Sequence, residues 1–122
     1  YSETAGYIIQ GKNKRALFIP DIDKWEKWNK NLIELVENFD YLLLDATFYE
    51  SKEISRDIDE IPHPLVTETM TLLDSLSPDT KSKVYFIHMN HTNLMLDPDS
   101  ELSKSVKSKG YNIARLGQKL YL

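Results

Sequence analysis

The stretch that decides the fold runs from Arg15 to Leu44 and reads RALFIPDIDKWEKWNKNLIELVENFDYLLL. It opens on a β-rich run, residues 15–20, and closes on a short apolar run, residues 41–44, typical of a strand covered on both faces. Between these runs the apolar residues recur at steps of three and four, which predicts an amphipathic helix from Lys24 to Phe39 with Asp23 as its N-cap. The stretch is therefore expected to form a βαβ unit.

The flanking segments extend this unit into a longer α/β chain. Upstream, the polar turn 11–14 would join a second β-rich run, residues 6–10, to residues 15–20 as a hairpin. Downstream, the charged stretch 50–64 is long enough to indicate a functional loop. Further helices are expected over residues 65–76 and 99–109, and further strands over 84–87, 111–115 and 119–122, the last two around a turn at Gly117. The predicted fold class is α/β, with a mixed sheet and about three helices.

Composition and charge exclude several classes of function. The 122 residues suffice for one domain, and 15 basic against 19 acidic residues give a net charge of -4 without a basic block, so no nucleic-acid partner is expected. The lack of cysteine excludes disulfides, thiolate metal sites and cysteine nucleophiles. No apolar run reaches the ~20 residues that cross a bilayer. We expect a soluble domain, cytoplasmic or periplasmic, with any targeting signal upstream of Tyr1.

Potential metal ligands follow three of the predicted strands. Asp21, Asp45 and His88 each stand directly after a strand that is expected to be parallel to the other two. The carboxyl ends of parallel strands meet at one edge of a sheet, where ligands bind, and the loop that contains His63 would lie above that edge. Carboxylates gathered there repel each other unless a proton, a hydrogen bond or a cation neutralises them. Oxygen and imidazole ligands suit zinc, manganese and iron, so the pattern favours a divalent metal site.

Each of these residues also has a purely structural interpretation. Aspartate is common after strands because its side chain accepts backbone hydrogen bonds, and Asp45 followed by Thr47 fits such a turn as well as a functional role. His88, at the end of an apolar strand, could be a buried histidine with its hydrogen bonds satisfied. His63 stands between two prolines, where a stiff backbone suits either a positioned acid or a simple turn. Spacing alone therefore does not establish an enzyme.

Five segments, in their order along the chain, resemble the later motifs of metallo-β-lactamase-fold proteins. They are YSETAGYII, LFIPDIDKW, YLLLDATFYE, EIPHPLV and FIHMNHTN, and they extend over most of the sequence. The set is most similar to the metallo-hydrolases related to pyrroloquinoline quinone biosynthesis protein B. The resemblance implies the C-terminal half of an αβ/βα sandwich, in which two similar halves pack sheet to sheet.

The resemblance also implies roles for individual residues. Asp21 in FIPD matches an aspartate that bridges two metal ions, and His88 in FIHMNH matches a histidine ligand. His63 in IPHP is similar to a loop histidine that donates a proton or contacts the substrate, which makes it the candidate catalytic residue. Asp45 matches a strand-end aspartate with a supporting role. The loop after His88 supplies two further residues that are implied to contact the metal ligands or the substrate, His91 and Asn93.

The sequence departs from the superfamily pattern in one large respect. The His-x-His-x-Asp-His segment and a further histidine do not occur, and the chain holds three histidines in all. Residues 1–122 are therefore expected to be a single partial domain, the second half of the fold, with the first half and most metal ligands upstream of Tyr1. The sheet face that the first half would cover should be apolar, which favours dependence on that segment or a homo-oligomer.

The implied function is that of a metal-dependent enzyme for which this fragment alone is inactive. A hydrolase-like reaction would use a metal-activated water on a small-molecule substrate, with a dinuclear site in the intact protein. Iron in the same pocket would favour an oxidative reaction of quinone-cofactor biosynthesis instead. Two alternatives stay open. One is a binding or carrier module that has lost catalysis, and the other is an ordinary α/β domain in which Asp21, Asp45 and His88 point away from one another.

Overall fold

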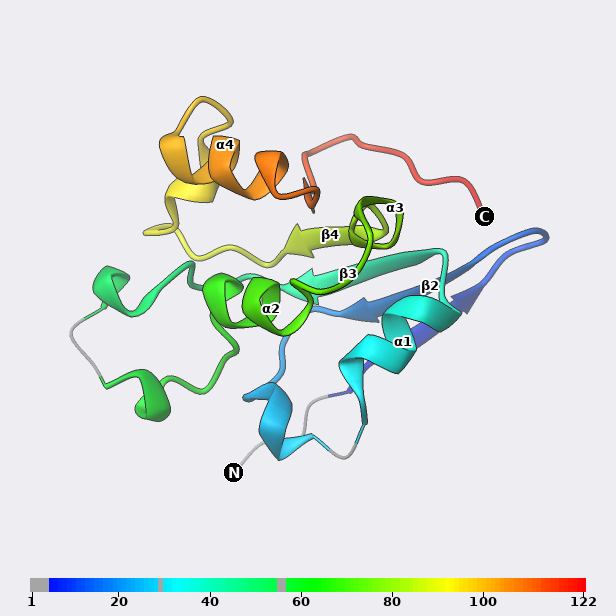
Figure 1. Ribbon diagram of the computed structural model, residues 1–122. Helices are drawn as coiled ribbons and strands as arrows, with labels where there is room; N and C mark the ends of the chain where they lie inside the picture. Colours follow the sequence, from blue (N-terminus) through cyan, green and yellow to red (C-terminus); the bar gives the residue numbers. More distant parts are fainter. Residues whose placement is uncertain (1–4, 29, 55–56) are drawn as a thin grey trace.

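The computed structural model describes residues 5–28, 30–54 and 57–122 (Figure 1). Its centre is one five-stranded sheet with the strand order β1-β2-β3-β4-β5. β1 pairs antiparallel with β2, and all other neighbours pair in parallel. The strands are β1 (Tyr7–Gln10), β2 (Arg15–Ile19), β3 (Tyr41–Asp45), β4 (Val84–Ile87) and β5 (Asn112–Ile113). The predicted α/β class with a mixed sheet is confirmed.

Three main helices cover one face of this sheet: α1 (Leu32–Asn38), α2 (Val66–Leu72) and α4 (Glu101–Ser108). Each connects two neighbouring parallel strands, and every crossover steps in the same direction across the sheet, so right-handed connections place all three on the same side. The connections also hold short helical turns: η1 (Trp25–Lys27), η2 (Ser51–Glu53), η3 (Ile58–Glu60), α3 (Pro78–Lys81) and η4 (Leu94–Leu96). None of the helices described here is long and apolar enough to cross a membrane.

The predicted continuous helix from residue 24 to residue 39 is wrong, because it divides into η1 and α1. The side chain of Asn31 caps α1, where its Oδ1 accepts hydrogen bonds from the backbone N–H groups of Ile33 at 2.9 Å and Glu34 at 3.4 Å. Asparagine stabilises a helix N-terminus better than a helix interior, so it starts a second helix here. Asp23 caps neither helix; it accepts a bond from the Lys24 N–H at 2.7 Å, which lowers the pKa of Asp23.

The end of the chain also differs from the prediction. The turn at Gly117 forms, with a φ of 81° that favours glycine, but residues 119–122 are not a strand. They instead lead to the turn of the β1–β2 hairpin, where the N–H of Asn13 donates to the carbonyl of Leu122 at 3.0 Å (Figure 1). Leu122 packs so closely on Gly11 that a side chain at Gly11 would collide with it. A single hydrogen bond of this kind does not make a strand ladder.

The two faces of the sheet differ in what covers them. One face points toward the helices and is buried in one core. It includes Leu17, Leu42 and Val84, which are in register on β2, β3 and β4. Successive residues of a strand point to opposite faces, so Phe18, Leu43 and Tyr85, which are also in register, form the other face. These three side chains are half-buried, and no described helix packs on them. One face is therefore a closed core and the other an open apolar surface.

Candidate active site

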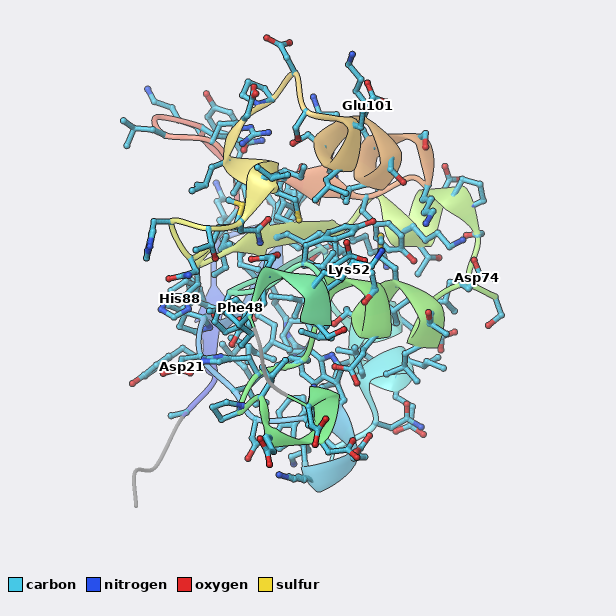
Figure 2. The ribbon with its side chains drawn as sticks, turned by 90° about the vertical axis from the view of Figure 1, so that its left-hand side faces the viewer. Asp21, Phe48, Lys52, Asp74, His88 and Glu101 are labelled. Carbon is cyan, nitrogen blue, oxygen red and sulfur yellow. The ribbon has the colours of Figure 1, made fainter. Side chains whose placement is uncertain are left out.

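Asp21, Asp45 and His88 do converge at one edge of the sheet. β2, β3 and β4 are parallel, so their carboxyl ends lie side by side. Asp45 is the last residue of β3, His88 follows β4, and Asp21 follows β2 by two residues. Figure 2 shows Asp21 and His88 on this edge, with Phe48 close by. Oxygens of Asp21 and Asp45 lie within 4.8 Å of each other, so these two side chains do not point apart, whereas His88 is not one of the three residues in that close group.

Asp45 is the centre of the cluster. Its side chain is wholly buried, and both of its oxygens accept hydrogen bonds. Oδ1 accepts from the N–H and the hydroxyl of Thr47 at 2.8 and 2.7 Å. Oδ2 accepts from the N–H of Ile22 at 3.1 Å and lies 2.8 Å from Nδ1 of His63. These bonds fill the acceptor positions of a carboxylate, and they tie the ends of β2 and β3 to the loop of His63.

His63 lies between η3 and α2 and is held by Asp45. Its Nδ1 is also 3.5 Å from Oδ1 of Asp21 and 3.3 Å from the Thr47 hydroxyl, and its ring packs edge-on against Phe48. The hydrogen bond to Asp45 raises the pKa of His63. The negative charges of Asp45 and Asp21 act in the same direction, while partial burial opposes them. The arrangement therefore favours a protonated imidazole beside a buried carboxylate.

Three of these groups stand at metal-binding separation. One oxygen of Asp21, one oxygen of Asp45 and one ring nitrogen of His63 all lie within 4.8 Å of one another. Carboxylate oxygen and imidazole nitrogen suit zinc, manganese or iron, so the donor set fits a divalent ion. Asp45 already accepts four hydrogen bonds, whereas the side chain of Asp21 is 54% exposed. Asp21 is therefore the better placed of the two aspartates for a metal ion.

His88 reaches the same cluster through Thr47. Its Nδ1 lies 3.1 Å from the Thr47 hydroxyl, and its ring centroid is 6.4 Å from that of His63. His88 has a φ of 62°, the left-handed conformation that residues other than glycine rarely adopt. Backbone hydrogen bonds hold the segments around it, from Ala46 to Ile87 at 2.8 Å and from Asn90 to Thr47 at 3.0 Å. Such strain is concentrated at functional sites in proteins.

The other two predicted site residues differ in burial and in their contacts. His91 is exposed. Asn93 is buried, and its Nδ2 donates to the carbonyl of Ala46 at 2.8 Å while its Oδ1 accepts from the N–H of Met95 at 2.9 Å. Asn93 therefore holds the turn after β3 through the carbonyl of Ala46.

Sequence reasoning missed the central position of Thr47. This residue is 8% exposed, and its hydroxyl lies within hydrogen-bond distance of Asp45, His63 and His88. The sequence left a turn role and a functional role equally open for Asp45, and the bond from the Thr47 N–H to Asp45 shows that the turn forms. The contacts to two histidines far away in the sequence had no local signal.

The sequence itself shows the class of protein. A family model described as a beta-lactamase superfamily domain matches residues 1–89. The chain therefore belongs to this superfamily, in agreement with its α/β fold and with the motifs that ended in Asp21, Asp45 and His88. No curated protein matches the chain.

A solved structure shows that the likeness in fold covers almost the whole chain. The 1.98-Å crystal structure of Zn²⁺-bound PqqB from Methylobacterium extorquens aligns with a TM-score of 0.77 and 24% sequence identity. The alignment covers 98% of this chain and 44% of that one. The predicted resemblance in fold to PqqB is thus confirmed, and the chain spans less than half the length of that protein.

Proposed function

We propose that this chain supplies the second half of a metal-dependent, hydrolase-like active site. Asp21 and His88 would bind a divalent metal ion, and His63 would transfer a proton under the control of Asp45. The observation that carries the proposal is the contact between the buried Asp45 and the partly buried His63, 2.8 Å apart and directly beside the half-exposed Asp21. A turn alone would not require a charged pair at this position.

Residues 1–122 form one partial domain in this proposal, and a segment upstream of Tyr1 completes it. Two observations support this partial domain: the alignment covers 44% of the PqqB chain, and no helix in residues 5–28, 30–54 and 57–122 packs on the face with Phe18, Leu43 and Tyr85. The upstream segment would cover that face and add the remaining ligands of a dinuclear site. Homo-oligomers that bury the same face are the competing arrangement.

The bound metal would lower the pKa of a water molecule and so provide a nucleophile at neutral pH. Zinc, manganese and iron all suit the carboxylate and imidazole donors present here, and the aligned PqqB structure is Zn²⁺-bound. His88 and Asp21 would orient the ion at the carboxyl ends of β4 and β2. Asp45 would keep its place as a hydrogen-bond acceptor and not as a ligand.

His63 supplies the proton in this mechanism. Its Nδ1–H donates to Asp45, which leaves Nε2 to face a small-molecule substrate. The raised pKa of His63 widens the pH range in which the imidazole is protonated, and the protonated ring could donate its Nε2–H to the leaving group. The buried Asp45 carboxylate stabilises the imidazolium before the transfer and holds the neutral ring in the same orientation afterwards.

Metal titration tests the proposal on the intact protein. We expect Zn²⁺ or Mn²⁺ to bind, and D21N and H88Q to weaken binding by at least the ~10–100-fold that follows loss of a supporting contact. H91Q serves as the matched control and should bind metal like the wild type. H63Q should keep metal affinity and reduce turnover of chromogenic ester substrates by about 10²–10⁴-fold.

Other outcomes would redirect the proposal. Binding of iron with oxygen consumption would support an oxidative reaction in the same pocket. Metal binding without any turnover, unchanged in H63Q, would support a binding or carrier module. Metal affinity that neither D21N nor H88Q alters would exclude these residues as ligands.

A further inference from the structure

We propose that Thr47 is a positioning residue that fixes His88 as its Nδ1–H tautomer, next to His63, whose Nδ1–H is fixed chiefly by Asp45, so that Nε2 of each neutral ring carries a free lone pair. The inference deepens the proposed function, because it names the atoms that would meet a metal ion or a substrate. It rests on the hydrogen-bond geometry around one buried hydroxyl group.

The number of available protons decides the direction of each hydrogen bond. A threonine hydroxyl has one proton to donate and can accept, whereas a carboxylate can only accept. The Thr47 hydroxyl lies 2.7 Å from Oδ1 of Asp45, so its single proton is donated there. It can then only accept from Nδ1 of His88, which lies 3.1 Å away. Nδ1 of His88 must therefore carry a proton.

The same reasoning applies to His63. Its Nδ1 lies 2.8 Å from Oδ2 of Asp45, which cannot donate, so Nδ1 carries the proton of this bond as well. The Thr47 hydroxyl at 3.3 Å is a second, weaker acceptor for it. Both neutral imidazoles are thus Nδ1–H tautomers with a free lone pair on Nε2. Because a hydrogen bond on one ring nitrogen determines the state of the other, the Thr47 hydroxyl sets the tautomer of His88, and Asp45 sets that of His63 with Thr47 as a weaker second acceptor.

The position of the hydroxyl is itself fixed by the backbone. The N–H of Thr47 donates to Asp45 at 2.8 Å, and its carbonyl accepts from the N–H of Asn90 at 3.0 Å. His88, by contrast, is exposed and has a left-handed backbone. Of the two partners, Thr47 is the better anchored, so it orients His88 and not the reverse.

The test reads the tautomers directly in the metal-free, ¹⁵N-histidine-labelled protein. Long-range ¹H–¹⁵N spectra distinguish Nδ1–H from Nε2–H, and H63Q and H88Q assign the signals. We expect Nδ1–H at both rings in the wild type. T47V should return His88 to a mixture of tautomers, while His63 keeps Nδ1–H because Asp45 still accepts from it. T47S should restore the wild-type spectrum, and the exposed His91 should be the same in all variants.

A second readout is the affinity for Zn²⁺ alone. We expect T47V to bind Zn²⁺ about 10–100-fold more weakly, the usual cost of losing a group that orients a ligand, and T47S to retain the wild-type affinity. If T47V does not fold, T47A makes the same test, because alanine also lacks the hydroxyl and leaves a void where valine would place a methyl group.

The outcomes separate this inference from the proposed function. A His88 tautomer that does not change in T47V or T47A overturns the positioning role, even where D21N and H88Q weaken Zn²⁺ binding as expected. Tautomers that respond as expected, in a protein that never binds a metal ion, support the positioning role and remove the metal-dependent function.

Discussion

Nδ1 of His63 lies 2.8 Å from Oδ2 of Asp45, a carboxylate that the fold buries completely at the end of β3. The two residues come from different elements, the strand β3 and the loop before α2. Their contact therefore exists only in the folded state. The pKa of His63 depends on this contact, so it should respond both to unfolding and to changes in the site. The first two predictions use this link.

Replacing Asp45 by Asn should lower the pKa of His63 toward its ordinary value. The neutral amide removes both the strongest hydrogen bond and the nearest negative charge that raise it. NMR titration of the His63 ring measures the shift. D23N is the control, because Asp23 contributes the weakest of the three charge effects at His63 and should change its pKa much less. Equal shifts in D45N and D23N would contradict the assignment of Asp45 as the main cause.

The stability of the metal-free protein should fall as the pH rises above about 6.5, the ordinary pKa of histidine in the unfolded chain. The folded state raises the pKa of His63 above the value of the unfolded chain, about 6.5. The resulting stabilisation is fully present below the unfolded pKa and is lost as the pH rises through the folded pKa. Urea unfolding between pH 6 and pH 9 measures this loss. D45N should flatten the dependence over this window, and an equally steep slope in D45N would exclude His63 as its source.

Substitution at His88 should separate backbone strain from side-chain function. H88G and H88A both remove the imidazole, but only glycine adopts a φ of 62° without steric cost. The left-handed conformation costs other residues about 1–2 kcal/mol, so H88G should be more stable than H88A by about 1 kcal/mol after the greater flexibility of unfolded glycine is included. Thermal unfolding measures both.

His91 provides the control for this comparison. It is exposed and has no left-handed backbone, so H91G should be no more stable than H91A. If H88A were as stable as H88G, the backbone at residue 88 would carry no strain in solution. Both His88 variants should lose metal affinity, and neither His91 variant should.

Much of the fold was predictable because its signals are local. The hairpin and the strand at residues 84–87 are apolar runs bounded by polar turns, and the structure has them nearly as predicted. The helix from residue 24 to residue 39 was mispredicted for a physical reason. Trp25 and Leu32 are both buried on the same core, so the apolar period continues across the break. Periodicity reports which side chains are buried, whereas the Asn31 cap determines where the helix begins.

The candidate site was predictable to the extent that topology creates it. Parallel strands end at one edge, so the residues that follow them, Asp21, Asp45 and His88, had to converge. The role of each residue within the site was not predictable. Thr47 contacts His63 and His88 from 16 and 41 residues away along the chain, and no local pattern encodes such contacts.

Asn93 should behave as a structural residue and not as a substrate contact. N93A would leave the carbonyl of Ala46 and the N–H of Met95 without these buried partners. Each unsatisfied buried group costs about 1–3 kcal/mol, so we expect N93A to lower the free energy of unfolding by ~2–3 kcal/mol, measured in urea. N90A is the control, because the Asn90 side chain donates only to the exposed Thr92 hydroxyl and its loss should cost less than about 0.5 kcal/mol. Equal stability of N93A and N90A would contradict this role.

The ion pair of Lys24 and Glu68 should respond differently to the loss of each partner. Nζ of Lys24 lies 2.6 Å from Oε1 of Glu68, with side-chain exposures of 4% and 32%. K24M removes the more deeply buried charge and leaves Glu68 in contact with water and with the N–H of Leu65 at 2.9 Å, so it should change stability little.

E68Q keeps the shape and an acceptor for Leu65 but leaves the ammonium of Lys24 buried beside a neutral group. Breaking a fully buried pair in this way costs ~3–5 kcal/mol, and the partial exposure of Glu68 reduces that figure because water can reach the site. We therefore expect E68Q to be less stable than K24M by at least about 1 kcal/mol in urea unfolding. The double variant K24M/E68Q should recover most of this loss, since no unpaired charge remains buried. A double variant as unstable as E68Q would show that the loss of stability comes from the side chain of Glu68 itself and not from the unpaired ammonium of Lys24.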